Sequence, residues 1–279
     1  MVLLQVPQSV IEENVFNALK EDVGEGDITA ELIPADNISL ATVISREDCV
    51  FCGLDWFEET YRQIDDEILI DWSVDDGEHI STGDIICTIS GYSQKIVTGE
   101  RTALNFVQTL SATATQSKKY ATEVIDTETK ILDTRKTIPG LRMAQKYAVS
   151  CGGCENHRLG LFDAFLIKEN HIKACEGIQN AVSEARFYNP EMSVEVEIEN
   201  LDELQQAIDA GADHVLLDNL DIETLKQAVN ICNGKVISEA SGNINLSNIN
   251  QVAQTGVNFI STGALTKDIK AIDLSMRFD

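Results

Sequence analysis

The sequence predicts an α/β protein in which a helix and an antiparallel β region precede a β/α barrel. Three observations support this fold class. Apolar residues have helical spacing near the N-terminus, short alternating runs separated by turns follow to about residue 98, and apolar strands then alternate with helices from about residue 130. The 279 residues, 43% of them hydrophobic, suffice for two ordinary domains. We place the boundary near residue 110, which gives domains 1–110 and 111–279.

The first domain is expected to begin with a helix over residues 9–21, where Ser9 is a candidate N-cap and the break at 24–27 is glycine-rich. Residues 38–98 are predicted to form antiparallel β structure, because runs such as 41–44 and 68–70 are separated by turn residues. Helical patterning returns over residues 100–124.

The second domain is predicted to contain a succession of strands at 131–133, 164–168, 193–198, 214–218, 236–239 and 257–261. Polar residues stand at or just past the carboxyl ends of these strands: Arg135, Lys136, Lys168, Glu197, Asp218, Glu239, Ser241, Ser261 and Gly263. In a β/α barrel those ends share one face, which carries the active site and often holds a phosphate in the loops after the last strands. Here the two loops are Ser241-Gly242-Asn243 and Thr262-Gly263-Ala264.

Charge is distributed unevenly along the chain. The net charge is −25, yet residues 130–173 contain eight Lys or Arg and only four acids. The overall acidity argues against nucleic acid and anionic membranes as partners, whereas the local cations favour a small anionic ligand. A solvated basic face remains the alternative.

Five potential cations come from three segments of the predicted barrel: Arg135, Lys136, His157, Arg158 and Lys168. Arg pairs with planar anions in a bidentate manner, whereas Lys acts as a point charge, so the mixture suits a ligand with carboxylate and phosphate groups. Taken singly, each is better explained as an ordinary surface charge.

The run 194–199 alternates valine or isoleucine with glutamate, which places Glu195, Glu197 and Glu199 on one face of a strand. A half-exposed strand explains this pattern without a function. In a barrel, however, the acidic face is enclosed and needs cations, a metal or ribose hydroxyls as partners, and we favour this interpretation.

The seven cysteines and the lack of an export signal indicate reduced thiols and a cytoplasmic protein. Two Cys-x-x-Cys pairs, Cys49/Cys52 and Cys151/Cys154, lie too far apart for a typical zinc module, and neither has a thioredoxin-like context. Residues 75–84 resemble a hairpin of biotinyl or lipoyl carriers but contain no modifiable lysine.

A family resemblance emerges from several segments in order. Residues 133–142 (DTRKTIPGLR) resemble the signature of quinolinate phosphoribosyltransferases, as do 99–105, 156–161, 166–171, 194–200, 217–219 and 239–242 at matching spacing. The departures are Cys154 and Asn243 where glycine is usual and Lys267 where histidine is frequent. Asn243 is tolerable in a tight turn, because asparagine adopts positive φ more readily than most residues.

The resemblance implies an N-terminal α/β sandwich-like domain, an incomplete TIM-like β/α barrel, and a homodimer or higher assembly. The last residues are expected to pack back on the N-terminal domain. Arg101 would reach the partner's active site, and Arg135, His157, Arg158 and Lys168 would surround the carboxylates of quinolinate. Thr134, Lys136, Lys168 and the two glycine loops would bind phosphoribosyl pyrophosphate.

The same resemblance assigns catalysis to Lys168, Glu197 and Asp218, with both carboxylates at Mg²⁺, directly or through water. The implied reaction transfers phosphoribosyl to quinolinate and releases pyrophosphate and CO₂, in NAD biosynthesis. Two alternatives remain: a homologous phosphoribosyltransferase with another acceptor, and a non-catalytic anion-binding or carrier protein.

Overall fold

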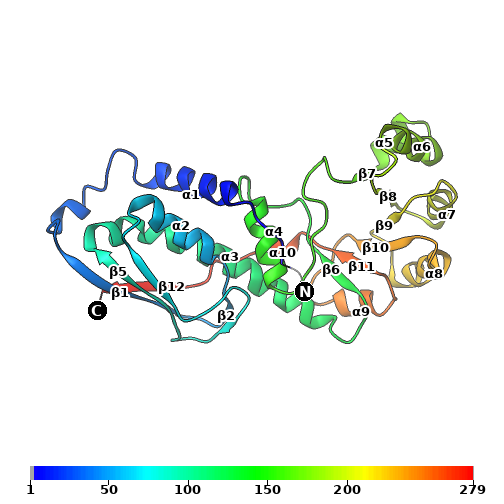
Figure 1. Cartoon of the computed structure of the whole chain (residues 1–279). Helices are drawn as coiled ribbons and strands as arrows, with labels where there is room; N and C mark the ends of the chain where they lie inside the picture. Colours follow the sequence, from blue (N-terminus) through cyan, green and yellow to red (C-terminus); the bar gives the residue numbers. More distant parts are fainter. Residues whose placement is uncertain (1–2, 279) are drawn as a thin grey trace. The chain divides into compact units, whose positions relative to one another are not determined.

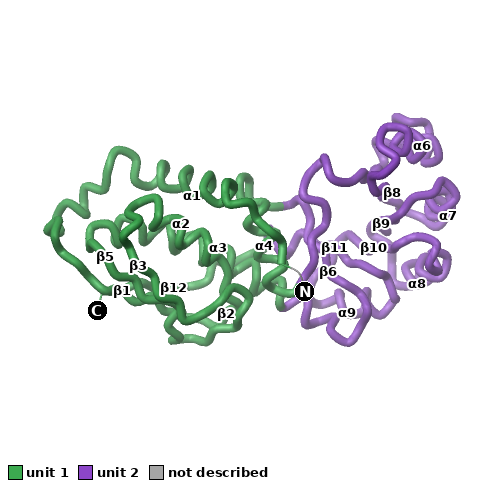
Figure 2. Tube along the Cα trace, in the orientation of Figure 1, with its two compact units in different colours: residues 1–118, 137–153, 268–279 green, residues 119–136, 154–267 purple. Residues whose placement is uncertain are grey.

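The computed structural model describes residues 3–278 and divides into two compact units (Figure 2). Unit 1 contains the chain up to residue 118, residues 137–153 and the residues from 268 onward. Unit 2 contains residues 119–136 and 154–267. Neither unit is continuous in sequence. Within the described part of the chain, no helix is both long and apolar enough to cross a bilayer.

The sheet of unit 1 is antiparallel, as predicted, with the strand order β12-β1-β5-β3. Its strands are β1 (Ile38–Ser45), β3 (Leu69–Trp72), β5 (Ile85–Tyr92) and β12 (Leu274–Phe278). A short ribbon pairs β2 (Cys49–Val50) with β4 (His79–Ile80). Ala41, Val43 and Ile89 point to the buried side of the sheet, so alternate residues of each strand form the core.

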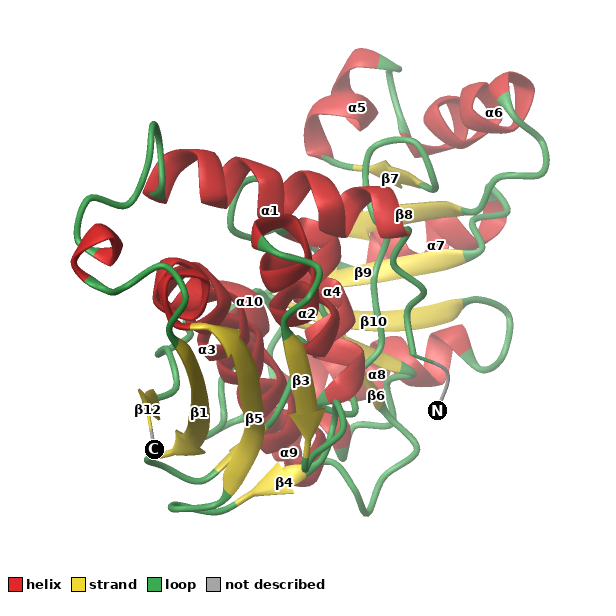
Figure 3. Cartoon of the chain, turned by 60° about the vertical axis from the view of Figure 1, so that its left-hand side comes forward, coloured by secondary structure: helices red, strands yellow, loops and turns green. Residues whose placement is uncertain are grey.

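The helices of unit 1 are α1 (Gln8–Asp22), the 3-10 helix η1 (Ala30–Leu32), α2 (Leu54–Ile64), α3 (Ser93–Glu123) and α4 (Arg142–Cys151). α2 and α3 contribute to the core beside β1 and β5 (Figure 3). The prediction of β structure throughout residues 38–98 was wrong at α2 and at the start of α3. In α2 the buried Phe57 and Tyr61 are one helical turn apart, and they pack with ring centroids 5.3 Å apart.

Unit 2 contains a parallel six-stranded sheet in the order β6-β11-β10-β9-β8-β7 (Figure 1). Its strands are β6 (Lys130–Leu132), β7 (Phe165–Ile167), β8 (Val194–Ile198), β9 (His214–Asp218), β10 (Ile237–Ser241) and β11 (Phe259–Ser261). The helices are α5 (Glu169–Ala174), α6 (Ile178–Tyr188), α7 (Leu201–Asp209), α8 (Ile222–Cys232), α9 (Ile249–Ala253) and α10 (Ala264–Lys267). All six predicted strands are confirmed.

The barrel of unit 2 is incomplete. Leu132 in β6 forms a parallel bridge with Glu155, so the sheet continues past β6 by one short segment. In the described residues no strand pairing joins that segment to β7, the opposite edge. Because the strands are parallel and in register, with Asp218 opposite Ser241 in β10, their carboxyl ends lie along one edge. This edge carries most of the predicted site residues.

Candidate active site

The loop after β6 lies against the loop after β11. The Thr134 hydroxyl accepts a hydrogen bond from the backbone N–H of Lys136 at 3.1 Å, and Thr266 donates to the Lys136 carbonyl at 2.8 Å. A Cβ atom at position 263 would lie 2.8 Å from Cδ of Lys136. Gly263 therefore leaves room for the lysine stem, and the exposed Lys136 stands beside a glycine loop suited to a phosphate.

Two arginines from different loops lie near each other at the same edge. Burial lowers the pKa of Arg158, and the neighbouring Arg135 cation lowers it further. Nη1 of Arg158 donates to the Ala164 carbonyl at 3.2 Å, while the buried Nε of Arg135 has no hydrogen-bond partner among the described residues. Two guanidinium groups placed together repel each other, so this arrangement favours an anion between or beside them.

Lys168 and Glu197 form an ion pair across the ends of β7 and β8. The lysine side chain is 44% exposed and the glutamate side chain 17% exposed, so the pair faces solvent at the edge of the sheet. One strand further on, Asp218 accepts a hydrogen bond from the Asn219 side chain at 2.8 Å. Two carboxylates and one ammonium group are thus aligned at adjacent strand ends.

The loop after β10 has the expected left-handed backbone, with φ of +93° at Gly242 and +53° at Asn243. Asn243 therefore tolerates positive φ, as predicted. Its side chain donates to Oδ1 of Asn219 at 3.0 Å, and the Asn219 backbone N–H donates to the Ser241 carbonyl at 2.9 Å. The loops that follow β9 and β10 are consequently tied together beside Asp218.

The Thr262 hydroxyl braces the other glycine loop. It donates to the Ile244 carbonyl and accepts from the Ala264 backbone N–H, both at 3.2 Å.

Glutamates inside the unit 2 sheet contact His157. Nε2 of His157 lies 3.1 Å from Oε2 of Glu195 and 3.5 Å from Oε2 of Glu239. Burial raises the pKa of Glu239 to about 7, and the negative charge of Glu195 acts in the same direction. The prediction that the acidic face of β8 is enclosed is confirmed for Glu195 and Glu197, which contact His157 and Lys168, whereas Glu199 is exposed.

Glu195 and Glu239 were predicted on the acidic face of one strand and at the carboxyl end of another, but neither was assigned a role in binding or catalysis. Their alternation with Glu197 and Ser241 along the strands was the available signal, since residues two apart share a face.

Arg101 is the one predicted site residue that the structure places in unit 1. It lies on α3 with a side chain 59% exposed, and its guanidinium is 4.0 Å from Glu100. All the other predicted site residues are in unit 2.

Cys52 and Cys151, one from each Cys-x-x-Cys pair, are neighbours in unit 1 beside Asp76. Both carboxylate oxygens of Asp76 already accept hydrogen bonds, from the backbone of residues 53 and 54 and from the Tyr147 hydroxyl. Burial raises the pKa of Cys52 well above its usual value. These contacts favour a structural role for the cluster rather than a zinc site.

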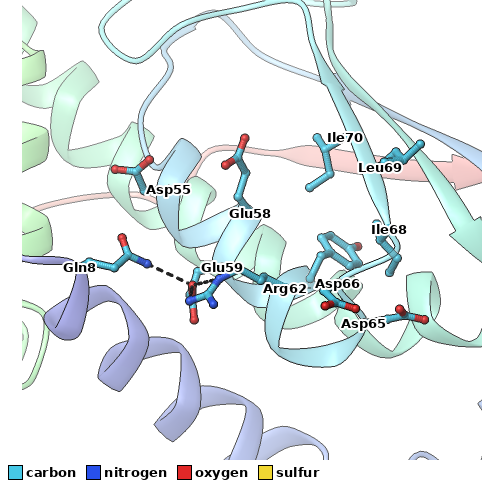
Figure 4. A pocket seen from close by; sticks show the side chains of 11 residues that line it. Gln8, Asp55, Glu58, Glu59, Arg62, Asp65, Asp66, Ile68, Leu69 and Ile70 are labelled. Atoms are coloured by element: carbon cyan, nitrogen blue, oxygen red, sulfur yellow. Dashed lines mark hydrogen bonds and ion pairs between the residues drawn. The ribbon is translucent and has the colours of Figure 1, made fainter.

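A separate pocket in unit 1 has a mainly acidic lining from α2 and the chain after it (Figure 4). Its Glu59 is satisfied by Arg62 and by the side chain of Gln8 at 3.2 Å. The acidic lining does not suit a phosphorylated anion, so the site at the carboxyl edge of unit 2 remains the candidate.

A parallel β/α sheet with clustered cations, aligned carboxylates and glycine loops at one edge defines an enzyme that acts on phosphorylated anions. The N-terminal and C-terminal domain models of quinolinate phosphoribosyl transferase match residues 27–111 and 113–277. The chain belongs to the quinolinate phosphoribosyltransferase family. Its activity is that of the decarboxylating enzyme, a pentosyltransferase of de novo NAD biosynthesis.

Several relatives cover nearly the whole chain. It is 39% identical to a chloroplastic nicotinate-nucleotide pyrophosphorylase (carboxylating) of Arabidopsis thaliana, covering 94% of this chain and 81% of the relative. It is 38% identical to a probable enzyme of that name from Bacillus subtilis, covering 92% and 89%. The solved nicotinate-nucleotide pyrophosphorylase of Francisella tularensis is 49% identical, with a TM-score of 0.96 over 99% and 98% of the two chains.

Proposed function

We propose that the carboxyl edge of the unit 2 sheet is the active site, where quinolinate receives the phosphoribosyl group. The observation that carries this assignment is the buried Nε of Arg135, which has no hydrogen-bond partner among the described residues and lies within electrostatic range of Arg158. Quinolinate has two adjacent carboxylates, and paired guanidinium groups match such a dianion in charge and in hydrogen-bonding geometry. His157 and Lys168 complete the predicted surroundings of these carboxylates.

The donor, phosphoribosyl pyrophosphate, would occupy the loops beside this cation pair. Lys136 and Lys168 supply point charges for the pyrophosphate, with Thr134 on the same loop. The 5′-phosphate would be held by Ser241-Gly242-Asn243 and Thr262-Gly263-Ala264, which follow the last two strands, where β/α barrels commonly bind phosphate. The left-handed backbone at Gly242 and Asn243 and the hydrogen bonds of the Thr262 hydroxyl support this assignment.

Glu197 and Asp218 fit a site for Mg²⁺. Both offer hard carboxylate oxygens, the donors that Mg²⁺ prefers, and their described hydrogen bonds use one oxygen of each. When bound, Mg²⁺ would neutralise part of the charge on the departing pyrophosphate.

The chemistry we assign to the site is attack by the pyridine nitrogen on the anomeric carbon. The N–C bond forms as the C–O bond to pyrophosphate breaks, through a transition state with oxocarbenium character. Glu197 and Asp218 would stabilise the positive charge that develops on the ribose, while Lys168 stabilises the leaving group. The 2-carboxylate then leaves as CO₂, a proton takes its place, and nicotinate mononucleotide results.

We further propose a homodimer in which Arg101 of one protomer reaches the active site of its partner. The 59% exposure of the Arg101 side chain on α3 supports the proposal. A cytoplasmic location is proposed as well, since all seven cysteines are free thiols, as expected in a reducing compartment.

The direct test is product formation from phosphoribosyl pyrophosphate and Mg²⁺ with quinolinate or nicotinate as the acceptor. The proposal expects nicotinate mononucleotide, pyrophosphate and CO₂ from quinolinate only. Product from nicotinate alone would favour the alternative acceptor, and product from neither would refute the substrate assignment. An Arg101→Ala variant mixed with a Lys168→Ala variant should recover part of the activity if active sites are shared between protomers.

A further inference from the structure

His157 contacts two glutamates inside the unit 2 sheet, and these glutamates have no role in the chemistry proposed above. The side chains of His157, Glu195 and Glu239 are 13%, 8% and 2% exposed. They come from the segment after the Leu132 bridge, from β8 and from β10. Two strands, β8 and β10, therefore each direct a glutamate at one largely buried imidazole.

The hydrogen bonds of His157 fix its tautomer. The backbone N–H of Arg158 donates to Nδ1 of His157 at 2.8 Å, so Nδ1 carries the lone pair. Nε2 therefore carries a hydrogen, which it directs at Glu195 and Glu239. An Nε2 that carries a hydrogen cannot ligate a metal ion. Both ring nitrogens are engaged by protein groups in this structure, so the imidazole also supports the segment that carries Arg158.

The imidazole supports the backbone that carries Arg158. The Arg158 N–H is fixed by Nδ1, and the His157 N–H donates to Oδ1 of Asp133 at 2.9 Å. The guanidinium of Arg158 then reaches the Ala164 carbonyl beside β7, the open edge of the barrel. The segment is thus held from within the sheet by the glutamates and at its far end by Arg158 itself.

Burial of Glu195 and Glu239 lowers the stability of the fold, and packing does not explain why they are buried. Oε1 of Glu195 and Oε1 of Glu239 are both buried and have no hydrogen-bond partner among the described residues. Buried unpaired oxygens and adjacent like charges destabilise a fold. Residues that reduce stability and are still buried at a site commonly serve its function.

We propose that Glu195 and Glu239 are positioning residues for acceptor binding: through His157 they hold the Arg158 backbone so that its guanidinium stays beside Arg135. This inference rests on the proposed function, because Arg158 is assigned there to a carboxylate of quinolinate. The two arginines repel each other, so a loosely held segment would let them separate. Loss of this positioning should therefore weaken the binding of the acceptor, quinolinate, and not the binding of the phosphoribosyl donor.

The test is steady-state kinetics of the full chain, with acceptor and donor varied separately, for Glu195→Gln and Glu239→Gln. The glutamine side chains keep the shape but replace the carboxyl group near Nε2 of His157 with an amide. We expect the KM for quinolinate to rise about tenfold or more, while the KM for phosphoribosyl pyrophosphate changes less than about twofold. The urea midpoint should be unchanged or higher. Glu199→Gln, from the same alternating run but exposed, is the matched control and should alter none of these values.

A second comparison tests the link through the imidazole. If the glutamates act through His157, the double variant His157→Ala/Glu239→Gln should have the same KM for quinolinate as His157→Ala alone. His157→Ala also tests the link if a glutamine variant does not fold.

An unchanged KM for quinolinate in the glutamine variants would overturn the inference. So would equal rises in both KM values, or additive effects in the double variant. If the wild-type enzyme used nicotinate and not quinolinate, the proposed function alone would be refuted. The comparison of KM values, repeated with nicotinate as the acceptor, would still decide whether the glutamates position the acceptor site.

Discussion

Replacement of Gly242 by alanine should disrupt the site far more than the addition of one methyl group suggests. A Cβ atom at this position would lie 2.2 Å from Oδ1 of Asn219 and 2.9 Å from its backbone nitrogen. Part of this conflict is with main chain, so Asn219 must move. Asn219 is hydrogen-bonded to Asp218 and to Asn243, and its displacement therefore reaches the proposed catalytic carboxylate and the proposed phosphate loop together.

Gly211→Ala is the matched control, because Gly211 has φ of +81°, close to the +93° of Gly242, with nothing within 4 Å of its Cβ position. Both variants should lose about 1 to 2 kcal/mol for an alanine in the left-handed region. Gly242→Ala should lose roughly 1 to 3 kcal/mol more from overpacking. Its kcat/KM for phosphoribosyl pyrophosphate should fall about 100-fold, as expected for misplacement by about 1 Å.

These predictions are tested by urea unfolding of the two variants and by their steady-state kinetics with phosphoribosyl pyrophosphate as the varied substrate. Equal activity in Gly242→Ala and Gly211→Ala would refute the steric coupling between the loops after β9 and β10.

Three further predictions concern charge, pH and helix capping. Lys168→Ala and Arg135→Ala should each lower kcat/KM by at least about 100-fold without unfolding the protein, because each leaves ligand anions unpaired; near-normal kinetics in both would refute the site assignment. Burial raises the pKa of Glu239 to about 7 from 4.5, so its native state keeps a proton that the unfolded state releases, and stability is lost as pH rises through that range. The difference in unfolding free energy between Glu239→Gln and the wild type should therefore shift in favour of the variant by up to about 3 kcal/mol from about pH 5 to pH 8. Urea titrations that show the same difference at every pH would contradict this. Asn200→Ala removes the cap that accepts from the Glu203 N–H at 2.9 Å, and calorimetry should show a loss of about 1 kcal/mol with activity retained.

Much of unit 2 could be predicted because its strands are short apolar runs that end in polar residues. That local pattern located β9 exactly and placed Lys168, Glu197 and Asp218 at neighbouring strand ends. α2 was missed because aromatic residues also favour strands, and its turn-like flanks resembled strand boundaries. Only packing between α2 and α3 distinguishes the two, and no local pattern contains that information.

The contacts of the site were harder to predict than its members. Alternation along β8 showed that Glu195 and Glu197 share a face, but their different partners, His157 and Lys168, depend on where two loops close over the sheet. The neighbouring Cys52 and Cys151 depend likewise on segments about a hundred residues apart in the sequence. Such long-range juxtapositions follow from tertiary structure and have no periodic signal.

The pairing of β1 with β12 has a consequence for biosynthesis. Ala41 pairs with Phe278, so the sheet of unit 1 joins residues that are far apart in the sequence and emerge from the ribosome at different times. The strands of unit 2 lie wholly between them in sequence and can associate while the chain is still growing. Until β12 arrives, one edge of β1 stays unpaired, and a free strand edge is a common point of aggregation. Nascent chains of this enzyme should therefore depend most on chaperones late in synthesis, when unit 2 is folded and unit 1 still lacks its last strand.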